Sequence, residues 1–182
     1  LRDNSIRLQK MIENLLNYTK MDAIQTNLNL ADFNFADISN KVIHAHALSI
    51  RNKALNIETA YHLDKNIVAD EEKLTIILDN LISNAVKYTP NAGHIKIGAK
   101  QEKKWLIIEV QDSGPGLAKD DQNKLFDPFY QGDSVHNGLI NGSGLGLTIA
   151  KNLAETHRGS IKLAPSDTGA HFVVQLPILD LN

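Results

Sequence analysis

The sequence predicts an α+β fold, a two-layer α/β sandwich in which helices cover one face of a mixed sheet. Residues 70–88 carry apolar side chains at helical spacing. Residues 94–101 and 104–112 are typical of two strands joined by a tight turn. The segments "GSIKLAP" and "GAHFVVQLP" close the chain as a hairpin. We therefore expect a sheet built mainly in the second half and covered by helices.

The first 35 residues are expected to form a helical stub and a linker. Within residues 1–26, positions 5–26 have helical spacing, with apolar residues at steps of three and four. This helix needs a partner, because one apolar stripe cannot be buried by a helix alone. The sequence begins at Leu1 in the middle of this pattern, so we expect a piece of a longer protein. Residues 27–35 are expected to be an extended linker.

Residues 36–182 are expected to form the main domain. It opens with a helix over residues 36–53, and residues 55–61 then alternate as a strand, with "IVAD" at 67–70 as a short partner. The next helix begins near Asp70, which is a plausible N-cap, and ends before Pro90.

After the two central strands, residues 113–143 are rich in Gly, Asp, Asn and Ser. Such long irregular segments inside a compact domain are usually functional or disordered. A helix is expected over residues 144–157, before the closing hairpin.

The composition excludes several classes of protein. Hydrophobic residues make up 42% and charged residues 22% of the 182 residues, as in soluble globular proteins. The net charge of -2 implies no general attraction to nucleic acid. The chain has no cysteine, which excludes a disulfide scaffold and a thiolate metal site. No apolar run approaches the roughly 20 residues of a membrane helix.

The helix over residues 70–88 carries an unexpected polar stripe. Asn80, Asn84 and Lys87 share one side, at the edge of the apolar face. Two amide oxygens and an ammonium at one place suit a magnesium ion with phosphates. A solvated helix edge with accidental amides explains this helix, taken alone, equally well.

Two glycine-rich motifs point to a ligand. "DSGPGL" at 112–117 directly follows a strand, so its carboxylate could accept a hydrogen bond from a ligand amine while the backbone comes close. "GSGLGL" at 142–147 places glycines at a helix N-terminus, where free N–H groups favour anions. Neither motif is a Walker loop, and neither is specific by itself.

In this order, the motifs resemble the catalytic ATP-binding domain of sensor histidine kinases. "NLISNAVKYTP" is similar to the family's asparagine box, "DSGPGL" and "GSGLGL" to its glycine boxes, and "LFDPFYQG" to its phenylalanine box. The resemblance covers residues 30–178 and implies a Bergerat-type ATP-binding fold, shared with type II topoisomerases and heat-shock chaperone ATPases. Residues 1–26 resemble the second helix of the dimerisation and phosphoacceptor hairpin.

The resemblance implies a role for each matching residue. Asn84 and Asn80 are the candidate magnesium ligands, Lys87 would contact phosphate, and Tyr88 would lie against adenine. Asp112 would accept a hydrogen bond from the adenine amino group. The remaining candidates are backbone positions that approach the nucleotide: Gly114, Gly116, Leu117, Gly142, Gly144, Leu145 and Gly146. Residues 118–141 would form a lid, with Phe126 and Phe129 packing its base or docking it to the helical stalk.

Two departures from the family matter for the chemistry. None of the seven histidines is followed by an acidic residue, so the resemblance implies that the acceptor lies upstream and that this piece cannot phosphorylate itself. The lid has no Arg or Lys between Lys124 and Lys151, where relatives often hold the terminal phosphate. His44 and His46 point in divergent directions on a helix, which argues against a metal site there.

The resemblance implies a protein-histidine kinase that uses ATP and Mg²⁺ and forms a homodimer at full length. Its expected partners are ATP or ADP, its own dimerisation hairpin and a response regulator receiver domain, and none is a nucleic acid. We expect a cytoplasmic domain of an inner-membrane-anchored sensor. Two alternatives stay open: a nucleotide-responsive binding module without phosphotransfer, and a chaperone- or topoisomerase-like ATPase. Asn80 argues against the second, because hydrolysing relatives have a glutamate base there.

Overall fold

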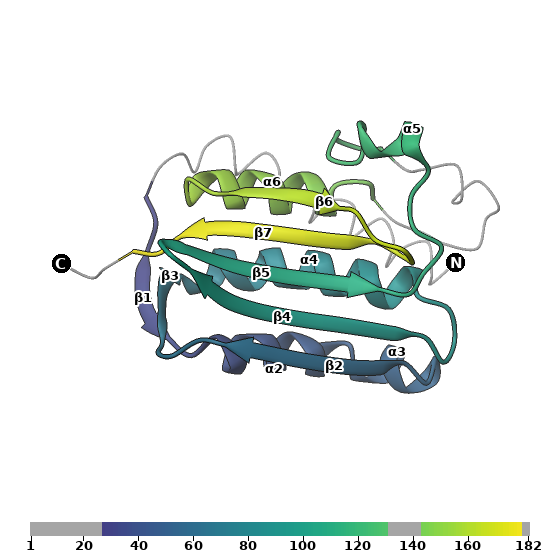
Figure 1. The fold of residues 1–182 in the computed structure, drawn as a ribbon, viewed down its shortest axis with the longest axis horizontal. Coiled ribbons are helices and arrows are strands. Elements are labelled where there is room, and N and C mark those ends of the chain that lie inside the picture. The colour runs from purple at the N-terminus through teal and green to yellow at the C-terminus, as the bar shows by residue number, and fades with distance from the viewer. Residues whose placement is uncertain (1–26, 131–142, 180–182) are drawn as a thin grey trace, which may run out of the picture.

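The computed structural model describes residues 27–130 and 143–179. These residues form two layers: a five-stranded sheet and, behind it in Figure 1, the helices α2, α4 and α6. The helices all cover one face, which confirms the predicted two-layer α+β sandwich. Within the described residues, no helix has the length and apolar character that crossing a bilayer requires.

The sheet has the order β2-β4-β5-β7-β6. Its strands are β2 (Asn56–His62), β4 (His94–Glu102), β5 (Trp105–Asp112), β6 (Ser160–Ala164) and β7 (His171–Pro177). Only β2 and β4 pair in parallel, with Asn56 opposite His94. Parallel pairing requires a crossover, and the chain between them contains the long helix α4. The other pairs are antiparallel, so the sheet is mixed, as predicted.

Helix α4 (Glu71–Tyr88) has the predicted limits because both of its ends are capped. Asp70 accepts a hydrogen bond from the Lys73 backbone N–H (3.0 Å). At the other end, the Thr89 backbone N–H and hydroxyl both donate to the Ala85 carbonyl. Pro90 follows and cannot continue the helix.

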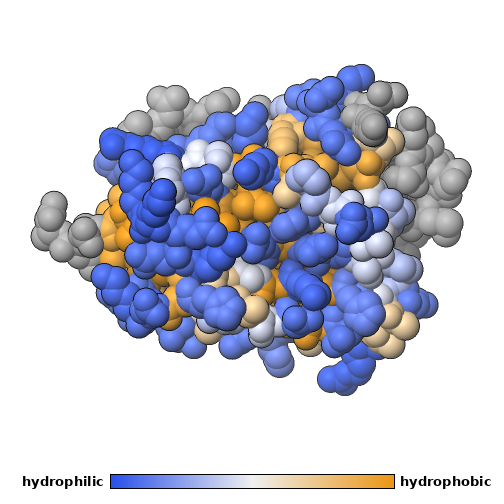
Figure 2. Space-filling model, in the orientation of Figure 1, coloured by the Kyte–Doolittle hydropathy of each residue, from blue (hydrophilic) through white to orange (hydrophobic). Residues whose placement is uncertain are grey.

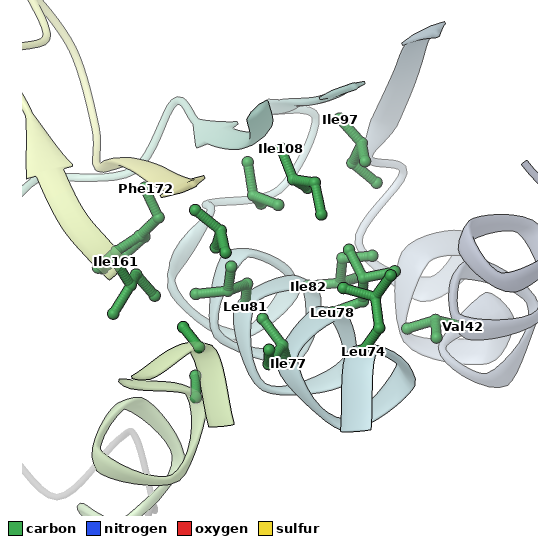
Figure 3. Packing of buried hydrophobic residues seen from close by; sticks show 14 of the residues in the cluster. Val42, Leu74, Ile77, Leu78, Leu81, Ile82, Ile97, Ile108, Ile161 and Phe172 are labelled. Atoms are coloured by element: carbon green, nitrogen blue, oxygen red, sulfur yellow. The ribbon is translucent and has the colours of Figure 1, made fainter. Parts of the chain in front are cut away.

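The apolar face of α4 is the centre of the core. Figure 3 shows its side chains on one side of the sheet residues Ile97 and Ile108, with Val42 of α2 beside them. Five consecutive core residues of α4 are completely buried: Leu74, Ile77, Leu78, Leu81 and Ile82. The opposite, open face of the sheet is largely hydrophilic in Figure 2. The helix is therefore packed against the core over most of its length.

The expected helix over residues 36–53 is wrong as one element. It consists of α2 (Phe35–Ala45) and α3 (Ala47–Asn52), which are separated at His46. Asn34 caps α2, since its side chain accepts from the Ala36 N–H at 2.8 Å. The His46 ring lies 2.8 Å from Asp79 of α4, where the chain changes direction.

The predicted pairing of "IVAD" with residues 55–61 is also wrong. Strand β3 (Ile67–Asp70) pairs antiparallel with β1 (Leu30–Phe33) in a separate two-stranded sheet. Strand β1 lies inside the segment expected to be an extended linker. The alternation in β2 reflects an edge strand whose Ile57 and Tyr61 pack on the core, while β4 is its only neighbour in the sheet.

The remaining helices are α5 (Lys119–Gln122), inside the predicted irregular segment, and α6 (Gly146–Thr156). Helix α6 begins and ends within two residues of the predicted limits. It packs against α4, β6 and β7. This packing brings its N-terminus to the polar edge of α4.

Candidate functional site

The polar stripe of α4 lies at the boundary between core and solvent. Asn80, Asn84 and Lys87 are half-buried, whereas the neighbouring Ile77 and Leu81 are completely buried. The Asn80 amide donates to the Ile76 carbonyl at 2.9 Å, which leaves its Oδ1 directed away from its own helix. The stripe is therefore a partly covered polar edge, as the sequence predicted.

The N-terminus of α6 lies against this edge. A Cβ placed on Gly146 would be 2.7 Å from Asn80 Oδ1, so only glycine fits there without displacing the amide. The first N–H groups of α6 have no partners within the helix, and the positive end of its dipole is at the same place. An amide oxygen and a site suited to an anion thus meet between α4 and α6.

Asp112 lies at the end of β5 and is buried, with 7% of its surface exposed. Its Oδ1 accepts from the Gly114 N–H (2.8 Å) and the Ala170 N–H (3.3 Å). Among the described residues, both hydrogen bonds to this carboxylate end on Oδ1, and Oδ2 is left to accept from a ligand. Burial raises the pKa of Asp112, although these two hydrogen bonds act to lower it.

Glycines form the wall around Asp112. A Cβ on Gly114 would lie 2.8 Å from Asp112 Oδ1 and 3.0 Å from the Tyr88 carbonyl. The turn "DSGPGL" therefore lies directly against the C-terminal end of α4. Gly116 has a φ of +72°, a backbone conformation that favours glycine, and Leu117 packs at the margin of the core.

Tyr88 and Lys87 are adjacent at the end of α4. The Lys87 ammonium lies 3.1 Å from the Tyr88 hydroxyl and 4.7 Å from the centre of its ring. The structure therefore brings an aromatic ring and a cation to the same end of the helix as the Asp112 turn.

The second glycine motif and the first turn of α6 contact the first half of the expected lid. Gly144 has a φ of +70°, and its carbonyl accepts from the Phe129 N–H at 2.9 Å. The Thr148 hydroxyl donates to the Phe126 carbonyl at 3.0 Å. Phe126 packs on the core, whereas Phe129 is 61% exposed. Leu145 is buried, so only its backbone could reach a ligand. Gly142 lies outside the described residues.

Sequence reasoning missed Gly169, in the turn between β6 and β7. A Cβ there would lie only 1.8 Å from the Asp112 carbonyl, and φ is +66°. A glycine in a predicted hairpin turn was the only signal. Its contact with Asp112 depends on β5 and β7 being neighbours, which the chain order does not reveal.

An open groove of about 540 Å³ lies elsewhere, along α2 and α3. Its lining is mainly apolar, with Arg51 and His44 among the polar residues. None of the predicted site residues lines it. We base the candidate site on the meeting of α4, α6 and the Asp112 turn, because chemically useful groups converge there.

Known proteins match this chain over most of its length. Residues 69–180 match the family described as histidine kinase-, DNA gyrase B-, and HSP90-like ATPase. The autoinducer 2 sensor kinase/phosphatase LuxQ of Vibrio parahaemolyticus is 32% identical, over 99% of this chain and 22% of LuxQ. The sensor-like histidine kinase SenX3 of Mycobacterium bovis is 30% identical, over 95% of this chain and 42% of SenX3. The chain thus spans less than half the length of these relatives.

Solved structures have the same fold. Full-length ShkA in complex with AMPPNP superimposes with a TM-score of 0.87 at 27% identity, over 99% of this chain and 38% of ShkA. The histidine kinase ThkA in complex with the response regulator protein TrrA gives a TM-score of 0.78 at 23% identity, over 98% of this chain and 49% of that chain. The second likeness supports the fold alone.

Proposed function

This chain belongs to the histidine kinase-, DNA gyrase B-, and HSP90-like ATPase family, and we propose that it is the ATP-binding catalytic domain of a sensor histidine kinase. The observation that carries the proposal is the convergence of three elements: the polar edge of α4, the Asp112 turn and the N-terminus of α6. In this proposal they would provide a carboxylate that recognises the base at one end and an anion site at the other.

The adenine would bind at the Asp112 end. Backbone donors hold Oδ1, so Oδ2 would accept from the adenine amino group. Gly114 and Gly116 keep this wall free of side chains, and Tyr88 offers an aromatic face beside it. A buried carboxylate with a fixed orientation discriminates strongly between an amino group and a carbonyl.

The phosphates would bind between α4 and α6. The backbone N–H groups of Gly144 and Gly146 near the start of α6 would donate to them, and Lys87 would add a positive charge. The Leu145 N–H, which donates to the Ser143 hydroxyl at 3.3 Å, would exchange that partner for a phosphate oxygen. Gly142 is proposed for the same role by its place in the motif. The likeness in fold to full-length ShkA in complex with AMPPNP supports this proposal.

The residues present fit a magnesium ion that arrives with the nucleotide. Asn80 Oδ1 is turned toward the α6 N-terminus, and Asn84 follows one helical turn later. Both are neutral oxygen donors, so the phosphates would have to supply the negative charge. Bound there, Mg²⁺ would neutralise charge on the phosphates.

Phosphoryl transfer in the longer protein would depend on positioning and on charge neutralisation. Asn80 cannot act as a base, which favours a neutral imidazole as acceptor, because it already carries a lone pair. We place that histidine on an upstream helical hairpin, which would also form the homodimer. The phosphate would pass on to an aspartate of a response regulator. A membrane anchor and a cytoplasmic location belong to the same proposal.

Titration calorimetry on the 182-residue chain tests the nucleotide site. Mg·ATP should bind, EDTA should weaken binding, and Asn84→Ala should weaken it at least about tenfold. Asn91→Ala, in the exposed turn after α4, is the control and should bind normally. No heat of binding from well-folded wild-type protein would refute the proposal.

A longer chain that includes the upstream hairpin tests the transfer step. Labelled ATP should produce acid-labile phosphohistidine there and no stable label on residues 1–182. The absence of a basic residue between Lys124 and Lys151 favours a second candidate, a binding module that signals without transfer. Rapid phosphohistidine formation rejects that candidate.

A further inference from the structure

A lysine from outside the sequence motifs caps the helix that carries them. Lys53, just after α3, places its Nζ 2.7 Å from the Val86 carbonyl and 3.0 Å from the Lys87 carbonyl. These carbonyls belong to the last turn of α4, where the helix itself provides no donors. The ammonium therefore bonds directly to the segment that presents Lys87 and Tyr88.

Without Lys53, this helix end would be incompletely capped. The Ala85 carbonyl receives the backbone N–H and the hydroxyl of Thr89. Among the described residues, the next two carbonyls, of Val86 and Lys87, accept from the Lys53 ammonium. A cation here also interacts favourably with the negative end of the helix dipole, and charge-assisted hydrogen bonds are stronger than neutral ones.

The backbone around Lys53 is itself fixed to the turn after α4. The Lys53 carbonyl accepts from the Ala92 N–H at 2.8 Å, and the Asn56 N–H donates to the Gly93 carbonyl at 2.9 Å. Lys53 is half-buried, and this partial burial lowers the pKa of its ammonium. The side chain thus extends from a rigid base, and its position is set before any ligand binds.

We propose that Lys53 is a positioning residue of the nucleotide site: by holding the last turn of α4, it fixes Lys87 and Tyr88 for the ligand. Lys53 acts through this turn and does not touch the nucleotide. The inference rests on the proposed function, because it concerns how well Mg·ATP binds.

The test uses three variants of the full chain at a temperature where circular dichroism shows each to be folded. Lys53→Met removes the donors, and Lys53→Arg restores a cation that can donate to both carbonyls. Lys73→Met is the matched control, because Lys73 pairs with Asp70 at the other end of the same helix (2.7 Å). The readouts are the Kd for Mg·ATP and amide hydrogen exchange at Tyr88 and Thr89.

Lys53→Met should weaken Mg·ATP binding about tenfold and speed exchange at the end of α4 by a similar factor. Lys53→Arg should recover most of the affinity. Lys73→Met should lower the melting temperature and leave the Kd unchanged. If Lys53→Met does not fold, Lys53→Gln, whose side chain is shorter and carries no charge, replaces it with the same criterion.

Wild-type affinity in the folded Lys53 variant overturns the inference, as does an equal loss of affinity in Lys73→Met. A wild-type chain that binds no Mg·ATP rejects the proposed function and this role together. Normal wild-type binding with no effect of Lys53→Met rejects the role of Lys53 alone.

Discussion

Asp112→Asn should weaken adenine recognition strongly without harming the fold. The carboxylate is buried, and its Oδ1 accepts from Gly114 and Ala170. An asparagine Oδ1 can accept the same two hydrogen bonds, which forces its Nδ2 into the place of Oδ2. The change therefore replaces the ligand-facing acceptor with a donor.

The expected loss of affinity follows from the bond removed. A hydrogen bond to a charged group contributes about 1.5–3 kcal/mol, so the Kd for ATP should rise about 10- to 150-fold. Stability should stay equal or increase. Because the folded pKa of Asp112 is raised, its contribution to stability is complete below the unfolded value of 3.8 and is lost as pH rises through the folded pKa. The neutral amide avoids that loss, so the stability of the variant should exceed that of the wild type by the largest margin at neutral pH.

Calorimetry with Mg·ATP and Mg·ITP, together with melting curves between pH 4 and 7, measures both effects. Inosine carries a carbonyl where adenine has its amino group, so the variant should prefer ITP relative to wild type. Glu109→Gln is the matched control: it lies on the same strand, half-buried beside Lys100 and His171. Unchanged ATP affinity, or a large loss of stability in Asp112→Asn, would contradict this account of the site.

Three further predictions concern backbone fit and one buried ring. Gly169→Ala should lower the free energy of unfolding by about 2 kcal/mol or more and weaken ATP binding, because its Cβ would overlap the Asp112 carbonyl at positive φ. Gly98→Ala, whose Cβ would have its nearest contact at 3.6 Å, should leave both stability and ATP affinity unchanged. Arg158 lies two residues after α6 at φ 59°, so Arg158→Gly should stabilise the fold by about 1 kcal/mol, a rise of about 2–4 °C in Tm, and leave ATP binding unchanged. Burial lowers the pKa of His157, whose Nε2 accepts from the Asp70 N–H. Stability should therefore fall as pH drops through the unfolded value of 6.5 toward the folded pKa, and a denaturation series should show a flatter profile for His157→Gln.

The local elements were predictable because their signals are local. Asp70 as N-cap and Pro90 as terminator determine α4 within the chain itself, and the helical repeat then places Asn80, Asn84 and Lys87 on one edge. The break at His46 was not predictable in this way. It coincides with a contact to Asp79, a residue 33 positions further along the chain.

The sequence alone determined the helix that carries the polar edge, the strand that ends in Asp112 and the glycines at both turns, since periodicity, caps and turn residues act over a few positions. Only the tertiary structure decided which of these elements meet. The pairing of β3 with β1, the approach of Gly169 to Asp112 and the capping of α4 by Lys53 all join residues more than 30 positions apart. Such contacts depend on strand order and on the packing of whole layers, and no local pattern specifies them.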